Sequence, residues 1–309
     1  MTGRSAAKTP AKPVWLSDVD IRIIRTIATH HYMTAKDIAY SVYEPTSLTY
    51  VRSRAARLAG CADHIPNQYL YRFSRPHTDP GRSEKVFTVG TKGRDLLASL
   101  QGVDDMDRRF RSYKLQALRY SFLLHALLLS RFIAAGTFWS RQQSEYDLVE
   151  SPLHYELAKN RRLTSITLQG KPVSVIVDAF LCFERVTDGS RFPLLFEADC
   201  GTESGRTFRQ HVRNRLAYLQ SPQYEELAKT SAGRVCYLTI GQHPRYKETR
   251  RAAMQRFTQD VLAELDMAHW ASVFLFASVD YNHLFQTPLF DQPMWYHPNS
   301  QTPVSLLPL

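Results

Sequence analysis

Two apolar segments that each run into carboxylates constrain this chain more than any other feature. Residues 173–177 have the apolar pattern of a buried strand and are followed by Asp178. Residues 194–196 predict a second strand, which runs into Glu197 and Asp199. Because strand side chains alternate between the two faces, Glu197 and Asp199 should point the same way. If the two strands are neighbours, all three carboxylates converge at one edge of a sheet.

Such a convergence of carboxylates predicts a metal site. Carboxylate oxygens are the hard ligands that Mg²⁺ or Mn²⁺ prefers. A cation held by Asp178, Glu197 and Asp199 would lower the pKa of a bound water and neutralise charge on a phosphodiester. The alternative is that one acid caps a loop and another pairs with an arginine, since perturbed acids also occur in structural ion pairs.

The charge of the chain indicates a polyanionic partner. The 309 residues carry a formal net charge of +10. Residues 1–100 alone contain fifteen lysines and arginines against eight acids. We therefore expect double-stranded DNA as the partner, with a basic protein of unrelated function as the alternative. The length is sufficient for two domains, each with its own core.

Cysteine usage and apolar content favour a cytoplasmic protein without a membrane partner. The four cysteines lie far apart and form no CxxC pair, which predicts free thiols in a reducing compartment. The longest apolar run, residues 122–129, is too short to span a bilayer, and residues 1–13 lack the apolar core of a signal peptide. No GxxxxGK[ST] loop is present, which argues against a nucleotide-driven motor.

Residues 14–100 have the pattern of a winged helix-turn-helix domain behind a disordered basic arm. Hydroxyl side chains at Ser17, at Thr34 and at residues 46–47 fit the N-caps of three short helices. Strands at residues 68–73 and 86–89 flank a long polar loop and would form the wing.

The third predicted helix has one apolar stripe and an opposite face rich in arginine, tyrosine and serine. Such a face suits a major groove, because arginine can grip guanine edges and hydroxyl groups can hold phosphates. The alternative is a solvated basic face on a winged helix that binds protein. The predicted DNA contacts are Ser47, Tyr50, Arg52, Arg54 and Arg57 on the helix, and Arg72, Arg75, Arg82 and Lys85 on the wing.

The remainder of the chain predicts a second, α+β domain. Residues 101–150 have the character of a linker followed by a long connecting helix, which is expected over residues 108–135. Over residues 151–280 the pattern gives a mixed sheet flanked by helices, and residues 281–309 predict an irregular tail. The strands expected in this sheet are residues 163–168, 172–183, 194–199, 235–240 and 271–278.

The αβββαβ order, with Asp178 and the Glu197-x-Asp199 pair, resembles the restriction-endonuclease-like PD-(D/E)xK nuclease fold. The longer string Phe196-Glu-Ala-Asp-Cys-Gly-Thr-Glu-Ser204, behind a winged helix, is similar to the replication-relaxation family of plasmids and integrative elements. The resemblance covers residues 15–280. It implies a DNA-binding protein that acts in replication or mobilisation of a mobile element, with replication or transfer proteins as further partners.

The chain departs from the nuclease pattern at two positions. Asp199 stands where the motif has a lysine, and Val177 stands where a proline precedes the first acid. That lysine would activate water and stabilise charge in the transition state. A residue of the following helix could replace it, either Arg215 as a permanent cation or His211 as a base. Alternatively, both side chains contact DNA phosphates or cover the sheet.

Two functions stay open at this point. In the first, the winged helix finds a site on duplex DNA and the second domain nicks or cleaves a strand with Mg²⁺ or Mn²⁺. In the second, the nuclease-like domain is a scaffold or a homodimerisation platform in a non-catalytic DNA-binding regulator or replication accessory. A protein-interaction adaptor is a third alternative.

Overall fold

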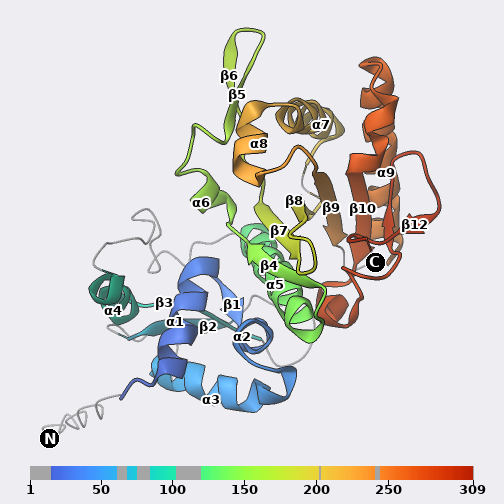
Figure 1. Cartoon of the computed structure of the whole chain (residues 1–309). Coiled ribbons are helices and arrows are strands. Elements are labelled where there is room, and N and C mark those ends of the chain that lie inside the picture. Colours follow the sequence, from blue (N-terminus) through green and yellow to red (C-terminus); the bar gives the residue numbers. More distant parts are fainter. Residues whose placement is uncertain are drawn as a thin grey trace, which may run out of the picture.

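The computed structural model describes residues 15–60, 68–74, 84–101, 120–201, 203–240 and 244–308. Within them the chain forms a mixed α+β structure with a smaller N-terminal unit and a larger unit built on a mixed sheet (Figure 1). The predicted α+β class is therefore confirmed. The predicted basic arm at residues 1–13 lies outside the described residues.

The N-terminal unit packs helices around a three-stranded sheet of order β1-β3-β2. Two capping boxes begin its first two α-helices, Ser17 with Asp20 and Thr34 with Asp37, as the hydroxyl caps predicted. Its elements are α1 (Asp18–His30), β1 (Met33–Thr34), α2 (Ala35–Val42), η1 (Pro45–Ser47), α3 (Leu48–Leu58), β2 (Leu70–Ser74), β3 (Lys85–Val89) and α4 (Thr91–Gln101).

Helix α3 begins differently from the prediction. Ser47 is its N-cap residue, but the Ser47 side chain makes no capping hydrogen bond. The preceding turn is the 3₁₀-helix η1, which starts at Pro45 and leads directly into α3. The predicted apolar stripe of α3 does form, with Val51, Ala55 and Leu58 fully buried against the other helices.

The larger unit is built on a seven-stranded sheet of order β12-β11-β10-β9-β8-β7-β4. The β8–β9 and β9–β10 pairs are parallel, and the other pairs are antiparallel. Its strands are β4 (Tyr146–Glu150), β7 (Ala179–Arg185), β8 (Arg191–Asp199), β9 (Arg234–Ile240), β10 (Phe274–Val279), β11 (Trp295–Tyr296) and β12 (Pro303–Val304).

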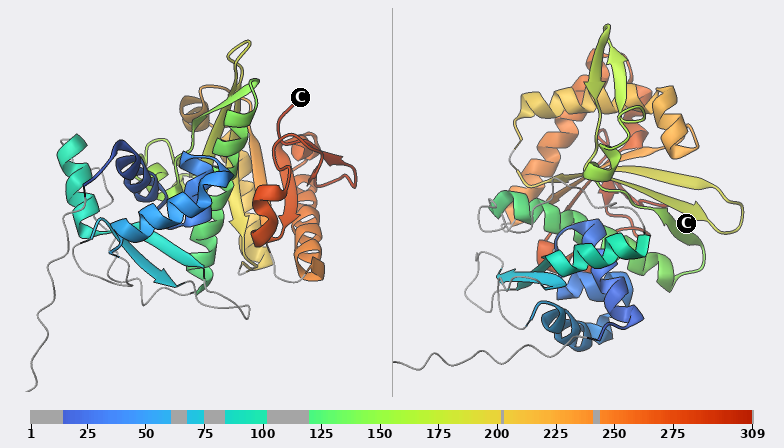
Figure 2. Two further views of the ribbon diagram at one scale, coloured as in Figure 1. Left: turned by 90° about the horizontal axis from the view of Figure 1, so that it is seen from below. Right: turned by 90° about the vertical axis from the view of Figure 1, so that its left-hand side faces the viewer.

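Helices cover both faces of this sheet (Figure 2). Helix α5 (Tyr120–Gln142) covers one face, where Phe132 stacks on Phe196 of β8 at 3.8 Å between ring centroids. The other face packs against α7 (Gly205–Leu219), α8 (Pro222–Ala228) and α9 (Pro244–Glu264). The strand residues alternate between the two cores, so that Phe196 faces α5 while Leu195 faces α7 and α9.

Helix α5 alone among the described helices is long and apolar enough to cross a membrane by length and composition. Within its most apolar stretch of 18 residues, 61% are buried inside the protein. The apolar character of α5 is therefore accounted for by its position against the sheet. The predicted helix start at residue 108 lies outside the described residues, and α5 extends beyond the predicted end at residue 135.

Three predicted features of the larger unit are wrong. Residues 172–183 are not one strand, because the chain leaves β6 (Lys171–Ser174) at residue 175 and turns before it enters β7. Strand β6 pairs only with β5 (Ser165–Leu168), in a hairpin separate from the main sheet. Strand β4, inside the predicted linker region, forms an edge of the sheet.

The tail after residue 280 is also more regular than predicted. The 3₁₀-helix η4 (Tyr281–Gln286) packs beside α5, and β11 and β12 extend the sheet beyond β10. Trp295 of β11 is fully buried, and its Nε1 donates a hydrogen bond to the carbonyl of Leu289 at 2.7 Å. As predicted, Cys182, Cys200 and Cys236 are free thiols, and the fourth cysteine, Cys61, lies outside the described residues.

Helix α5 also joins the two units. Its Arg131, which is 2% exposed, donates to Asp37 Oδ1 of α2 at 2.8 Å and to the carbonyl of Tyr281 at 3.1 Å. Arg141, in the last turn of the same helix, donates to the main-chain carbonyls of Tyr40, Ser41 and Tyr43 at the end of α2. The N-terminal unit is thereby fixed on the helix that covers the sheet.

Candidate functional site

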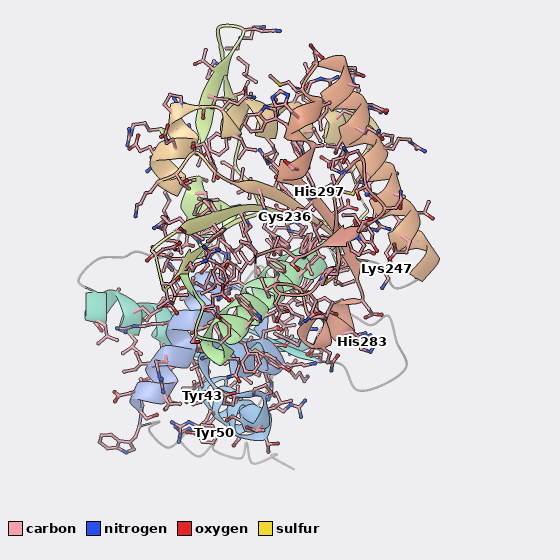
Figure 3. All side chains as sticks on the ribbon, turned by 45° about the vertical axis from the view of Figure 1, so that its right-hand side comes forward. Tyr43, Tyr50, Cys236, Lys247, His283 and His297 are labelled. Carbon is pink, nitrogen blue, oxygen red and sulfur yellow. The ribbon has the colours of Figure 1, made fainter. Side chains whose placement is uncertain are left out.

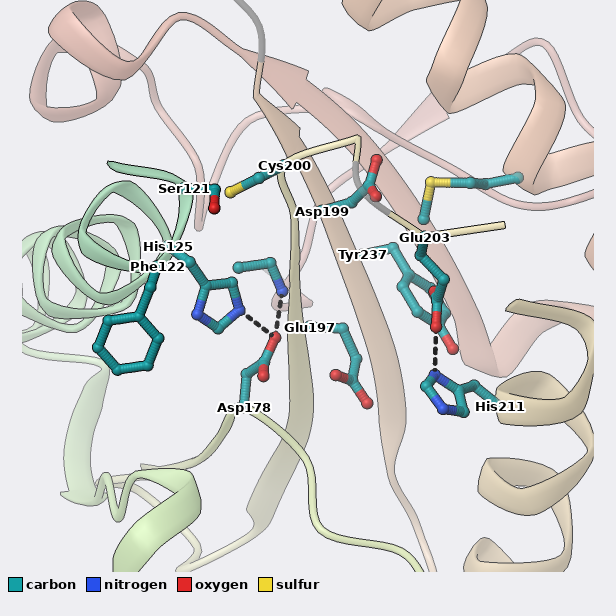
Figure 4. A pocket seen from close by; sticks show the side chains of 12 residues that line it. Ser121, Phe122, His125, Asp178, Glu197, Asp199, Cys200, Glu203, His211 and Tyr237 are labelled. Carbon is teal, nitrogen blue, oxygen red and sulfur yellow. Dashed lines mark hydrogen bonds and ion pairs between the residues drawn. The ribbon is translucent and has the colours of Figure 1, made fainter. Parts of the chain in front are cut away.

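The three predicted acids line one cavity of about 390 Å³ (Figure 4). Strands β7 and β8 are antiparallel, and Ala179 pairs with Phe196, so the start of β7 meets the end of β8. Asp178 therefore lies at the start of a strand and not at its end as predicted. Its Oδ2 accepts a hydrogen bond from the Ala198 N–H at 2.9 Å, between Glu197 and Asp199 in sequence.

Each of the three carboxylates is paired with a cationic or ionisable base. His125 of α5 places Nε2 3.0 Å from Asp178 Oδ2. Arg215 of α7 donates from Nε to Glu197 Oε1 at 2.6 Å. The third pair is a fork, in which Nε and Nη2 of Arg250 in α9 bind the two oxygens of Asp199 at 2.9 and 3.0 Å.

The pKa values of Asp178 and Glu197 are shifted in opposite directions, although burial acts to raise both. Burial alone would raise the pKa of Asp178, but the hydrogen bond and charge of His125, with the Ala198 N–H, hold this pKa below its usual value. Burial raises the pKa of Glu197 to about 7, and the neighbouring Asp178 adds to this effect against the opposing charge of Arg215. Burial would lower the pKa of His125, yet its contact with Asp178 raises it overall.

This arrangement does not fit a divalent cation. In the described part of the chain, no group of three or more His, Cys, Asp or Glu side chains could hold a metal ion. Arg215 already occupies Oε1 of Glu197, and the Arg250 fork occupies both oxygens of Asp199. The Mg²⁺ or Mn²⁺ site expected from the sequence stays a prediction, and for Asp199 to bind the cation the Arg250 fork would have to open.

The two helix residues expected near the acids both reach the cavity region. Arg215 is 4% exposed and also donates to the carbonyl of Ile176 at 2.8 Å. His211 lines the cavity and places Nδ1 2.8 Å from Glu203 Oε1 (Figure 4). That contact, above all, raises the pKa of His211. A catalytic role for either residue stays a prediction.

Sequence reasoning missed His125, Arg250 and the pairing role of Glu203. His125 interrupts an apolar run, and this pattern indicates a histidine near the boundary of the core. The pattern does not indicate which residue the histidine contacts. Arg250 lies 51 residues after Asp199, on a helix whose position over the sheet only the tertiary structure determines. Glu203 is part of the acidic string that carried the family resemblance.

The predicted DNA-binding face of α3 has both free and engaged residues. Tyr50 and Arg52 are exposed, and Ser47 is half-buried. Tyr50 packs edge-on against Tyr43 at 5.9 Å between ring centroids, and both lie at the end of the molecule away from the main sheet (Figure 3). Arg54 and Arg57 instead converge on Asp20.

The predicted wing residues are partly described. Arg72 lies in β2 and is half-buried, and Lys85 of β3 donates to Ser74 Oγ at 2.7 Å. Arg75 and Arg82 lie outside the described residues. DNA contacts by any of these side chains stay predictions.

The Asp20 cluster leads to a stability prediction. Asp20 is fully buried and binds Nε of Arg54 at 2.9 Å, while Arg57 is 43% exposed and lies 3.1 Å away. We expect Arg54→Met to lower the free energy of unfolding by about 2 kcal/mol, as loss of a hydrogen bond to a buried charge does. Arg57→Met should cost less than about 1 kcal/mol because solvent screens that pair. Urea unfolding checks this order, and equal losses would contradict it.

Comparison with known proteins identifies the class. A model of the replication-relaxation family matches residues 24–234, which is more than half of the chain. The match covers most of the N-terminal unit, the larger unit as far as the start of β9, and all three acids. The protein therefore belongs to the replication-relaxation family, and membership indicates a role in replication or relaxation of mobile elements. Comparisons with curated proteins and with solved structures found no match.

Proposed function

We propose that this protein is a DNA-binding accessory that acts in replication or mobilisation of a plasmid or integrative element. Its N-terminal unit is then a winged helix, with α3 as the recognition helix and the β2–β3 hairpin as the wing. Its sheet unit is a restriction-endonuclease-like scaffold that does not cut DNA. Family membership supports a role in the replication of mobile elements, and the net charge of +10 favours a nucleic acid as partner.

The observation that carries the proposed DNA binding is the two-sided character of α3. Val51, Ala55 and Leu58 are fully buried on one side, which fixes the rotation of the helix. The opposite side exposes Thr49, Tyr50, Arg52 and Ser53. A rigidly held helix that presents arginine, tyrosine and hydroxyl groups to solvent has the chemistry for a major groove.

The ion pairs in the cavity favour a scaffold over a nuclease. A hydrolytic metal site needs carboxylate oxygens that are open to the cation. Here Arg215 pairs with Glu197 and Arg250 with Asp199, and Arg215 is also held by the carbonyl of Ile176. The shared cavity of the three acids is the observation that supports the alternative, metal-dependent nicking.

Charge reversal on α3 tests the proposed DNA binding. We expect Arg52→Glu to weaken binding to duplex DNA about tenfold and to reduce the slope of log K against log salt by about 1, because one phosphate or base contact is lost. Fluorescence anisotropy of a labelled mixed-sequence duplex measures both quantities. Arg256→Glu, at an exposed position of α9, is the matched control. Arg54 is unsuitable because its loss also removes a partner of Asp20.

Equal affinities for the wild type and Arg52→Glu would contradict the recognition role of α3.

A separate assay addresses nicking. The wild type is incubated with supercoiled plasmid and Mg²⁺ or Mn²⁺, beside an Asp178→Asn/Glu197→Gln variant. We expect no relaxation of the plasmid by either protein. Metal-dependent nicking that the double variant lacks would establish the nuclease alternative instead.

A further inference from the structure

A hairpin projects from the larger unit at the end of the molecule opposite α3 (Figure 1). It consists of β5 and β6, which pair with each other and not with the seven-stranded sheet. Leu168 pairs with Lys171, so Gln169 and Gly170 form a two-residue turn. Both turn residues have positive φ, 51° and 75°, as the tightest hairpin turns require.

The base of this hairpin is firmly attached. Ile166 is buried in the core beneath α7, and Leu168 and Val173 pack against the same core. The Tyr218 hydroxyl of α7 donates to the carbonyl of Leu163 at 2.8 Å, just before β5. An isolated two-stranded hairpin is marginally stable in water, so this anchoring allows the tip to be ordered while it projects into solvent.

The hairpin and the residues that lead into and out of it carry only positive charge. Residues 157–177 contain four lysines and arginines and no aspartate or glutamate. Arg161 and Lys171 are exposed and form no ion pair with any residue in the described ranges. Arg162 pairs with Glu226, but both side chains are largely exposed, so a stronger anion can compete for this arginine. Thr167 and Gln169 add exposed hydrogen-bonding groups near the tip.

We propose that the β5–β6 hairpin is a second DNA-contacting element, which enters the major groove of duplex DNA at the end of the molecule opposite α3. The major groove accommodates a two-stranded β-ribbon, and phosphates on its rim would meet Arg161 and Lys171. Because α3 and the hairpin lie at opposite ends, they would hold separate tracts of duplex. This inference rests on the proposed DNA binding but uses different residues, so that each can fail without the other.

The test reverses the charge of the hairpin in the full-length chain. We expect Arg161→Glu/Lys171→Glu to reduce the slope of log K against log salt by about 2, since each lost phosphate contact contributes about 0.9. Arg161→Lys/Lys171→Arg keeps both charges and should keep the wild-type slope. Circular dichroism checks that the variants are folded, as the exposure of both side chains predicts.

Photocrosslinking locates the contact. A benzophenone amino acid at Thr167 should crosslink to the labelled duplex, and the crosslink should persist when Arg52→Glu weakens the α3 contact. An unchanged salt slope in the charge-reversed variant, or no crosslink from Thr167, overturns the hairpin inference. A hairpin effect without an Arg52→Glu effect overturns the recognition role of α3 and leaves the hairpin inference standing. A wild type that binds no duplex overturns both.

Discussion

Replacement of Arg131 by methionine is expected to lower the free energy of unfolding by about 3–5 kcal/mol, because removing one partner of a buried ion pair leaves an uncompensated charge. Arg131 is 2% exposed and Asp37 is fully buried. Asp37 cannot turn away to solvent, since its Oδ2 also accepts the Thr34 N–H at 2.8 Å in the capping box of α2. Urea unfolding followed by circular dichroism measures the loss.

A second variant separates the lost charge from the lost packing. Arg131→Met/Asp37→Asn removes both charges but keeps an acceptor for the Thr34 N–H, so it should recover at least half of the stability lost in the single variant. A loss below about 1 kcal/mol in Arg131→Met, the value of an exposed pair, would contradict the prediction. Arg131 also stacks on the Tyr281 ring at 3.9 Å, and methionine retains part of that contact.

The Arg131 contacts give the N-terminal unit a defined position. Arg131 binds Asp37 of α2, while α2 packs against α3 in the small core. Arg141 reinforces the same junction at the other end of α2. The proposed recognition helix is therefore held in a fixed orientation relative to the sheet unit and to the β5–β6 hairpin. That orientation is what would allow two separate duplex tracts to be held at a set angle.

Local patterns in the sequence were sufficient for much of the fold. Capping boxes at Ser17 and Thr34 define two helix starts, because a hydroxyl and an acid three residues later satisfy orphan N–H groups within a single turn. Strands β8 and β9 could be predicted from their apolar runs, since both are buried on two faces. Alternation along β8 also placed Glu197 and Asp199 on one face.

Long-range pairing decided the features that the sequence did not reveal. Strands β11 and β12 have two residues each, and they exist as strands only because β11 pairs with the edge of β10 and β12 pairs with β11. Residues 172–183 are mostly apolar on both sides of Asp178, although the chain turns there from the hairpin to the sheet. The cations beside the acids come from α5, α7 and α9, and no local period indicates which side chain of each helix reaches the cavity.

The titration of Glu197 should make stability depend on pH. Its pKa in the folded protein is about 7, above the usual 4.5, so the folded state holds a proton that the unfolded chain releases. This contribution to stability is complete below about pH 4.5 and is lost as the pH rises to about 7. A shift of this size corresponds to roughly 3 kcal/mol. Glu197→Gln removes the titration and keeps the shape of the side chain.

We therefore expect the stability of the wild type, relative to Glu197→Gln, to fall by about 3 kcal/mol between pH 4.5 and pH 8. Urea unfolding of both proteins across this range measures the difference. His125 and His211 also have raised pKa values, and their stabilising contributions fade as the pH rises. Because both histidines are present in the two proteins, their effects largely cancel in the difference. The acid Asp178, with a lowered pKa, titrates below this range.

Replacement of Arg215, the arginine that pairs with Glu197, provides the complementary test. Arg215→Met leaves Glu197 buried beside Asp178 without its arginine, so the pKa of Glu197 should rise further. The variant should then lose more stability at pH 8, where the wild-type carboxylate is ionised and paired, than at pH 5. A wild-type stability that stays constant relative to Glu197→Gln across the range would show that Glu197 is ionised throughout. Glu197 and Arg215 would then form a permanent salt bridge, in which the charge of Arg215 fully offsets the effect of burial on the pKa of Glu197.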